Sequence, residues 1–201
     1  ALSLSLMAAE PVAVTTPAAA PITAWMSWEA GVDLIGFTKP GLTAPNVILH
    51  VARMVHTPIG SAPSGMVLWQ PDPAAAPVVA GFVCTDLAVG AYFGPQVFAG
   101  TPFAAMPVLL AKITVEASAT KATSTIVAAG HTFVVTMAKL APITAFDRPI
   151  GPMPFRQVGV EQIPGSITVT IDGKPIEVIV PPADPVAGAF ATFATTGLYT
   201  R

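Results

Sequence analysis

The chain has 201 residues, of which 53% are hydrophobic and 10% are charged, and its formal net charge is −2 at pH 7. This balance argues against a nucleic-acid-binding function, because no basic patch can form. The mean hydropathy of +0.68 is high. The 22 prolines and 16 glycines nevertheless divide the chain, and no stretch approaches the roughly 20 uninterrupted apolar residues of a membrane-spanning helix. We therefore expect no stable membrane insertion, and we expect apolar surface to be buried against other proteins.

The N-terminal region is rich in alanine, proline, threonine and valine. Residues 1–24 carry one charge, at Glu10, which predicts an extended arm or a peripheral strand. The first ten residues lack the positive segment of a signal peptide, so we expect no export by the general secretion route. Apolar residues recur in residues 25–37 at a spacing that allows a short helix, although Gly31 and Gly36 weaken this prediction.

The rest of the chain alternates between apolar runs and proline-rich stretches. Residues 46–55 alternate loosely and predict a strand. Proline-rich residues 57–77 predict extended and turn conformations, and residues 142–164 predict a loop. Residues 181–201 begin with two prolines and predict a second extended arm.

A short phrase recurs three times, at residues 94–105, 123–135 and 165–177. Each copy has a β-branched or aromatic run, a glycine, one further residue, a proline or threonine, and then an apolar run. This order predicts a strand, a tight turn and a second strand. A glycine at the turn supplies a positive φ without steric cost. The sequence therefore predicts an all-β fold built from short hairpins.

Few residues are available for chemistry. No pair of acids has the spacing of a known acid–base site, and no glycine-rich phosphate loop or nucleophile-elbow motif is present. Cys84 lies in an apolar run that is typical of an inert buried thiol, although a cysteine nucleophile with a histidine base is an alternative. Three histidines and one cysteine also make a complete tetrahedral ligand set for Zn²⁺, although their spacing does not establish convergence. These four residues are His50, His56, Cys84 and His131.

Two of the phrases resemble the repeat of PAAR proteins, which form the pointed caps on the spikes of type VI secretion systems and contractile phage tails. Residues 97–106 and 169–176 are similar to the family's apolar strand, glycine-containing turn and Pro-Ala-Ala-Arg sequence. Residues 50–65 resemble the stretch rich in histidine and proline that precedes this phrase in larger PAAR-like modules. The chain departs from the pattern at Met106, which replaces the arginine, and at Glu177, which replaces an alanine.

The resemblance implies a compact cone or prism of short β-hairpins over residues 46–180. Extended Pro/Ala-rich arms at 1–45 and 181–201 would flank it. The implied function is a non-enzymatic piercing cap on a trimeric β-helical spike protein, with a structural Zn²⁺ at the tip held by the three histidines and Cys84. Effector or tail components would bind the N-terminal arm. Assembly would take place in the cytoplasm, followed by release outside the cell or delivery into the target cell.

Two other functions fit the same sequence features. A viral or phage-like capsid, decoration or filament subunit would also have a surface of low charge and arms that neighbouring copies exchange. A small β enzyme would use Cys84 as its nucleophile, which predicts a reactive thiolate at neutral pH.

Overall fold

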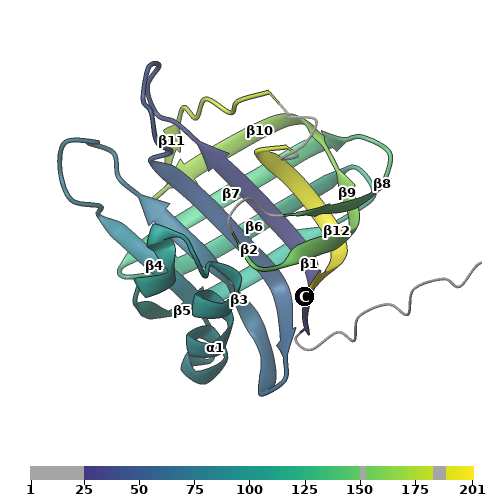
Figure 1. The fold of residues 1–201 in the computed structure, drawn as a ribbon. Helices are drawn as coiled ribbons and strands as arrows, with labels where there is room; N and C mark the ends of the chain where they lie inside the picture. The colour runs from purple at the N-terminus through teal and green to yellow at the C-terminus, as the bar shows by residue number, and fades with distance from the viewer. Residues whose placement is uncertain (1–24, 150–152, 183–188) are drawn as a thin grey trace, which may run out of the picture.

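The computed structural model describes residues 25–149, 153–182 and 189–201 (Figure 1). These residues form twelve strands, one α-helix and one short 3-10 helix. The strands are β1 Trp25–Gly36, β2 Val47–Thr57, β3 Gly60–Trp69, β4 Val79–Cys84, β5 Val108–Ala117, β6 Lys121–Ala128, β7 His131–Leu140, β8 Thr144–Pro149, β9 Arg156–Gln162, β10 Pro164–Ile171, β11 Lys174–Ile176 and β12 Ala191–Thr200. The helices are α1 Leu87–Val97 and η1 Pro102–Ala105.

All twelve strands belong to one sheet, in the order β11-β10-β7-β6-β5-β4-β3-β2-β1-β12-β9-β8. Neighbouring strands run antiparallel except β4 and β5, which pair in parallel across the connection that contains α1. The prediction of an all-β fold is confirmed. A cone or prism of short hairpins is not shown, because the sheet is continuous and β1 alone is 12 residues long.

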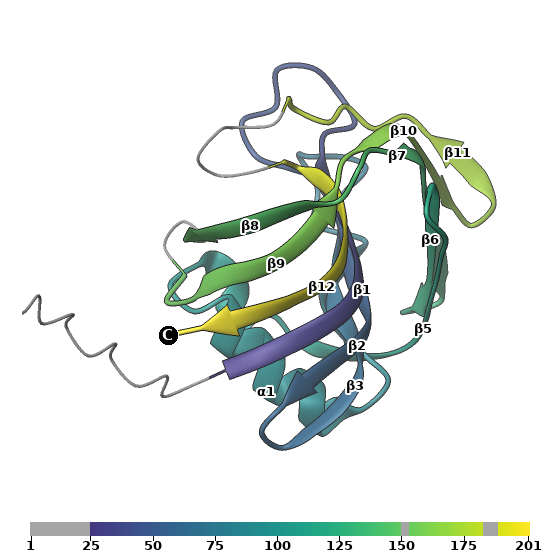
Figure 2. The same cartoon turned by 90° about the vertical axis from the view of Figure 1, so that its right-hand side faces the viewer.

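The sheet curls so that its two halves face each other, as Figure 2 shows. The larger core lies between these halves and collects side chains from both, including Leu34, Leu49, Phe133 and Met137. A second core packs α1 against the other face of the sheet. Strands β1, β2 and β12 contribute side chains to both cores.

The two segments predicted as arms each contribute an interior strand to this sheet. β1 lies in the range 1–45 and β12 in the range 181–201, and the two strands pair directly, with Val32 opposite Phe193. The short helix expected within residues 25–37 is wrong, because β2 and β12 flank this segment and satisfy its backbone groups as a strand. The arm or peripheral strand predicted for residues 1–24 lies outside the described residues.

Two of the three phrases form the predicted hairpins. β6 and β7 turn at Ala129 and Gly130, and β10 and β11 turn at Asp172 and Gly173. All four turn residues have positive φ, between 50° and 81°, which is the geometry of a two-residue type I′ turn. The loop predicted at residues 142–164 is wrong, because β8 and β9 pair there as a further hairpin.

The first phrase is not a hairpin, because α1 and η1 occupy it. Asp86 caps the N-terminus of α1 by accepting hydrogen bonds from the backbone N–H groups of Ala88 at 2.8 Å and Val89 at 3.1 Å. A Cβ atom at Gly94 would overlap the ring of Phe82. Gly94 therefore allows the close approach of helix and sheet. Gly100, the glycine of the predicted turn, has a φ of 81° but lies between α1 and η1 and not between two strands.

Candidate functional site

A cavity of about 150 Å³ lies between the C-terminal end of α1, at Val97 and Phe98, and residues of strands β1, β2, β8, β9 and β12. Its titratable lining residues are Asp33, His50, Arg148 and Tyr199. The other lining residues are uncharged, and most are apolar: Ile35, Val97, Phe98, Met153, Gln157, Ala189, Phe190 and Thr192. An apolar pocket with a few convergent polar groups is the usual form of a small-molecule site.

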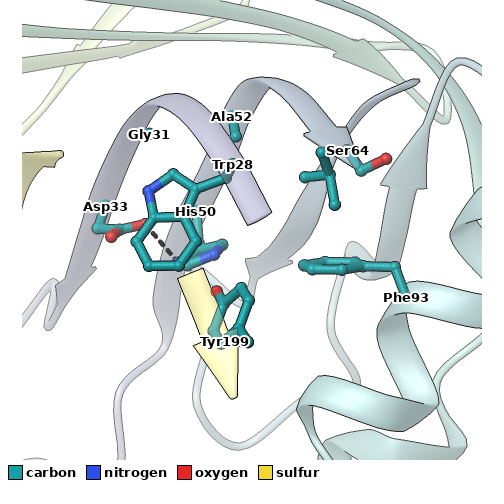
Figure 3. A pocket seen from close by; sticks show the side chains of 9 residues that line it. Trp28, Gly31, Asp33, His50, Ala52, Ser64, Phe93 and Tyr199 are labelled. Atoms are coloured by element: carbon teal, nitrogen blue, oxygen red, sulfur yellow. Dashed lines mark ion pairs between the residues drawn. The ribbon is translucent and has the colours of Figure 1, made fainter. Parts of the chain in front are cut away.

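His50 and Asp33 form the central pair of this cavity. They stand directly opposite each other on β2 and β1, and His50 Nδ1 pairs with Asp33 Oδ1 (Figure 3). Burial on its own lowers the pKa of His50, but the charge of Asp33 and the hydrogen bond to it outweigh burial and raise that pKa. Because Asp33 occupies Nδ1, Nε2 is the ring nitrogen available to a ligand.

Irregularities in three adjacent strands place the site residues on one face. Ala30 in β1 has a φ of 50°. At the same level, the pairing of β2 with β3 shifts its register between Ala52 and Val55. The pairing of β12 with β9 shifts its register between Ala194 and Thr196. Strand residues an odd number apart normally point to opposite faces. When a β-bulge lies between two such residues, their side chains point to the same face, and bulges redirect side chains in this way at active sites.

Arg148 is held in place by Glu161 across the β8–β9 hairpin. Its Nη1 donates to Glu161 Oε1 at 2.8 Å and its Nη2 donates to Oε2 at 2.7 Å. The two side chains are only 19% and 10% exposed. The hydrogen bonds to Glu161 are the main cause of the raised pKa of Arg148, and the charge of Asp33 contributes to it. The guanidinium also lies 4.3 Å from the ring centre of Phe146.

Tyr199 brings a buried phenol to the cavity. Its ring centre lies 4.6 Å from that of Trp28. Burial, and then the charge of Asp33, raise the pKa of Tyr199, while a hydrogen bond with Gln157 acts in the opposite direction. The phenol is therefore neutral at physiological pH and can donate a hydrogen bond.

A second, enclosed cavity of about 10 Å³ lies beside the His50–Asp33 pair (Figure 3). Its lining includes Asp33, His50 and Tyr199, which also line the larger cavity, and Ser64. A volume of this size holds about one water molecule. The Ser64 hydroxyl lies 2.9 Å from Cys84 Sγ, so one residue that lines the small cavity is in contact with the buried thiol.

The four predicted zinc ligands have separate partners. His50 pairs with Asp33, and Cys84 is buried against Ser64. The remaining two histidines form their own pairs: His56 Nε2 lies 2.9 Å from Glu29 Oε1, and His131 Nδ1 lies 2.8 Å from Asp172 Oδ2. Within residues 25–149, 153–182 and 189–201, no group of three or more histidine, cysteine or acidic residues is arranged to hold a metal. Zinc binding by the four residues stays a prediction.

Most residues of the cavity were missed by sequence reasoning, which identified only His50. Asp33, Arg148 and Tyr199 come from segments predicted as arm, loop and arm. One signal was present: Asp33 is an acid among apolar residues, Val32 and Leu34, in a chain of low charge. A buried charge of this kind needs a partner, which here is His50.

No protein-family model matches the chain, and no curated protein sequence matches it. Among solved structures, the chain is similar to the crystal structure of acetoacetate decarboxylase from Legionella pneumophila subsp. pneumophila str. Philadelphia 1. The match covers 98% of this chain and 96% of that one, with 11% sequence identity and a TM-score of 0.36. At these values the likeness transfers no activity to this chain.

Two predictions are corrected at this point. The spike-tip function and the prediction of no enzymatic activity both rested on the resemblance to PAAR proteins, and both are corrected because the structure does not have the fold that this resemblance implies. A continuous curled sheet, with a cavity on the face that packs against α1, replaces the expected assembly of short hairpins. In the described residues, no helix is long and apolar enough to cross a membrane.

Proposed function

We propose that the protein is an enzyme that binds a small molecule in the cavity and transfers protons to or from it through His50. The observation that carries this proposal is the pairing of His50 with Asp33 on the wall of the cavity. Histidine is the side chain that changes charge near neutral pH, and an acid at one ring nitrogen fixes its orientation and tautomer.

The other polar groups of the cavity have roles that follow from their chemistry. The phenol of Tyr199 supplies a hydrogen bond to an oxygen of the bound molecule, where negative charge develops during proton removal. Arg148 provides a fixed positive group on the same wall. The apolar lining, which includes Ile35, Phe98 and Phe190, excludes water from the reacting atoms.

The lining also limits the reaction class. None of the five lysines of the chain lines the cavity, so the proposal does not include a Schiff base between a lysine and a carbonyl substrate. A cavity of about 150 Å³ is smaller than the roughly 300–1,000 Å³ of pockets for drug-sized ligands. The proposed substrate is accordingly a small carbonyl compound with an exchangeable proton.

The test is deuterium exchange in D₂O, followed by proton NMR, over a panel of small carbonyl compounds with and without charge. We expect the protein to accelerate exchange of at least one compound, and His50→Gln to lower that rate by about 10²-fold or more. His131→Gln is the matched control, because His131 also pairs with an acid but does not line the cavity. No acceleration by the wild-type protein, or equal rates in the two variants, would contradict the proposal.

A further inference from the structure

We propose that the ligand of this cavity is an uncharged molecule with a carbonyl or hydroxyl oxygen and a short apolar chain. This inference rests on the proposed function, because it concerns the same cavity. It follows from the charges on the cavity wall, each of which has a partner within the protein.

The positive charge of Arg148 is already compensated. Glu161 takes two hydrogen bonds from its guanidinium, with both nitrogen–oxygen distances under 3 Å. This is the bidentate geometry in which arginine binds a carboxylate most strongly. Both side chains are largely buried, so solvent screens the pair little. A substrate carboxylate would have to compete with Glu161 for the same guanidinium.

The charge of His50 is compensated in the same way by Asp33. When His50 is protonated, the pair is neutral. When His50 is neutral, Asp33 leaves a net negative charge. Asp33 lines the same cavity as Arg148 and Tyr199, and its negative charge contributes to the raised pKa of both groups. In neither state does the wall carry a surplus positive charge for an anion.

The remaining polar groups suit an uncharged ligand. Gln157 offers an amide, Thr192 a hydroxyl and Tyr199 a neutral phenol, all of which can donate or accept hydrogen bonds without charge. A carboxylate would be taken out of water without a counter-charge, which is costly. An ammonium group would find only the charge of Asp33, which His50 already pairs with when it is protonated. A ketone, an amide or an alcohol loses little on desolvation when these groups bond to it.

The experiment compares three ligands of nearly the same shape: 2-pentanone, butanamide and butanoate. Their dissociation constants are measured by protein-observed NMR at pH 7. We expect both neutral compounds to bind about tenfold or more tightly than butanoate, which corresponds to about 1.4 kcal/mol. Tighter binding of butanoate would overturn this inference and leave the proposed function standing. Failure of all three to bind would overturn the ligand cavity, and both proposals with it.

A second experiment tests whether the pairing of Arg148 with Glu161 causes the preference for uncharged ligands. Glu161→Gln releases Arg148 from its partner, so we expect butanoate to gain affinity about tenfold while 2-pentanone changes little. The double variant Glu161→Gln with Arg148→Gln should lose that gain, which separates the charge effect from a change in folding. Asp147→Asn is the control, because Asp147 pairs with Arg156 at exposed positions outside the cavity lining. An unchanged preference in folded Glu161→Gln would overturn the inference.

Discussion

Trp28 and Asp33 stand five residues apart on β1 and yet line the same cavity. In a regular strand an odd separation would place them on opposite faces of the sheet. The break at Ala30 restores them to one face. The same relation holds on β12, where Thr192 and Tyr199 stand seven residues apart and both line the larger cavity, with the register shift between them.

The first prediction concerns the break itself. Ala30 is buried and has a φ of 50°, a conformation that a β-branched side chain resists. We expect Ala30→Val to lower the free energy of unfolding by about 2 kcal/mol or more. Ala30→Gly is the control, and should be neutral or slightly stabilising because glycine adopts this φ freely. Urea denaturation measures both, and equal stability of the two variants would contradict the role assigned to Ala30.

The second prediction concerns the packing of α1 on the sheet. Gly94→Ala would place a methyl carbon 2.3–2.5 Å from three ring atoms of Phe82, so we expect the free energy of unfolding to fall by about 2–3 kcal/mol. Gly130→Ala is the comparison, because nothing lies within 4 Å of its added carbon and only its φ of 81° is strained. That variant should lose about 1 kcal/mol. A smaller loss for Gly94→Ala than for Gly130→Ala in thermal or urea denaturation would show that helix and sheet do not approach so closely.

The third prediction concerns the pH dependence of stability. Asp33 raises the pKa of His50 in the folded protein, so the folded state holds this proton more tightly than the unfolded state does. The stabilisation is fully present below the unfolded pKa of histidine, about 6.5, and is lost as pH rises through the folded pKa. Asp33→Asn should remove this contribution. Denaturation of both proteins between pH 5 and pH 9 measures it, and parallel stability curves would refute the coupling.

The fourth prediction compares two ion pairs on the same β8–β9 hairpin. Arg148→Ala leaves Glu161 buried without its partner, so we expect a loss of about 3 kcal/mol. Arg156→Ala breaks the pair with Asp147, whose side chains are 53% and 60% exposed. This loss should be about 0.5 kcal/mol or less. Double-mutant cycles for both pairs provide the measurement, and similar coupling energies in the two cycles would contradict the burial argument.

Local patterns in the sequence predicted the elements that neighbouring residues determine. The hairpins at Ala129–Gly130 and Asp172–Gly173 were predictable because a two-residue turn with positive φ depends on the turn residues and the strands beside it. The strand at 46–55 was predictable from its alternation for the same reason. The phrase at 94–105 misled although its turn glycine, Gly100, has the expected positive φ of 81°. The turn joins α1 to η1 because the residues before it pack as a helix against Phe82 of β4, and no local pattern reveals that contact.

By itself, the sequence determined that the chain is all-β, poor in charge and divided by turns, because composition and alternation act over a few residues. Only the tertiary structure decided that residues 25–36 and 191–200 are paired interior strands, since their pairing joins segments more than 150 residues apart. It also decided the site. Asp33, His50, Arg148 and Tyr199 come from four strands. Asp33 and His50 meet because β1 and β2 pair in this register, and the register shift in β12 brings Tyr199 to the same face. Which side chains share a face of the sheet depends on the pairing of strands that are distant in the sequence, and no spacing within the sequence encodes this pairing.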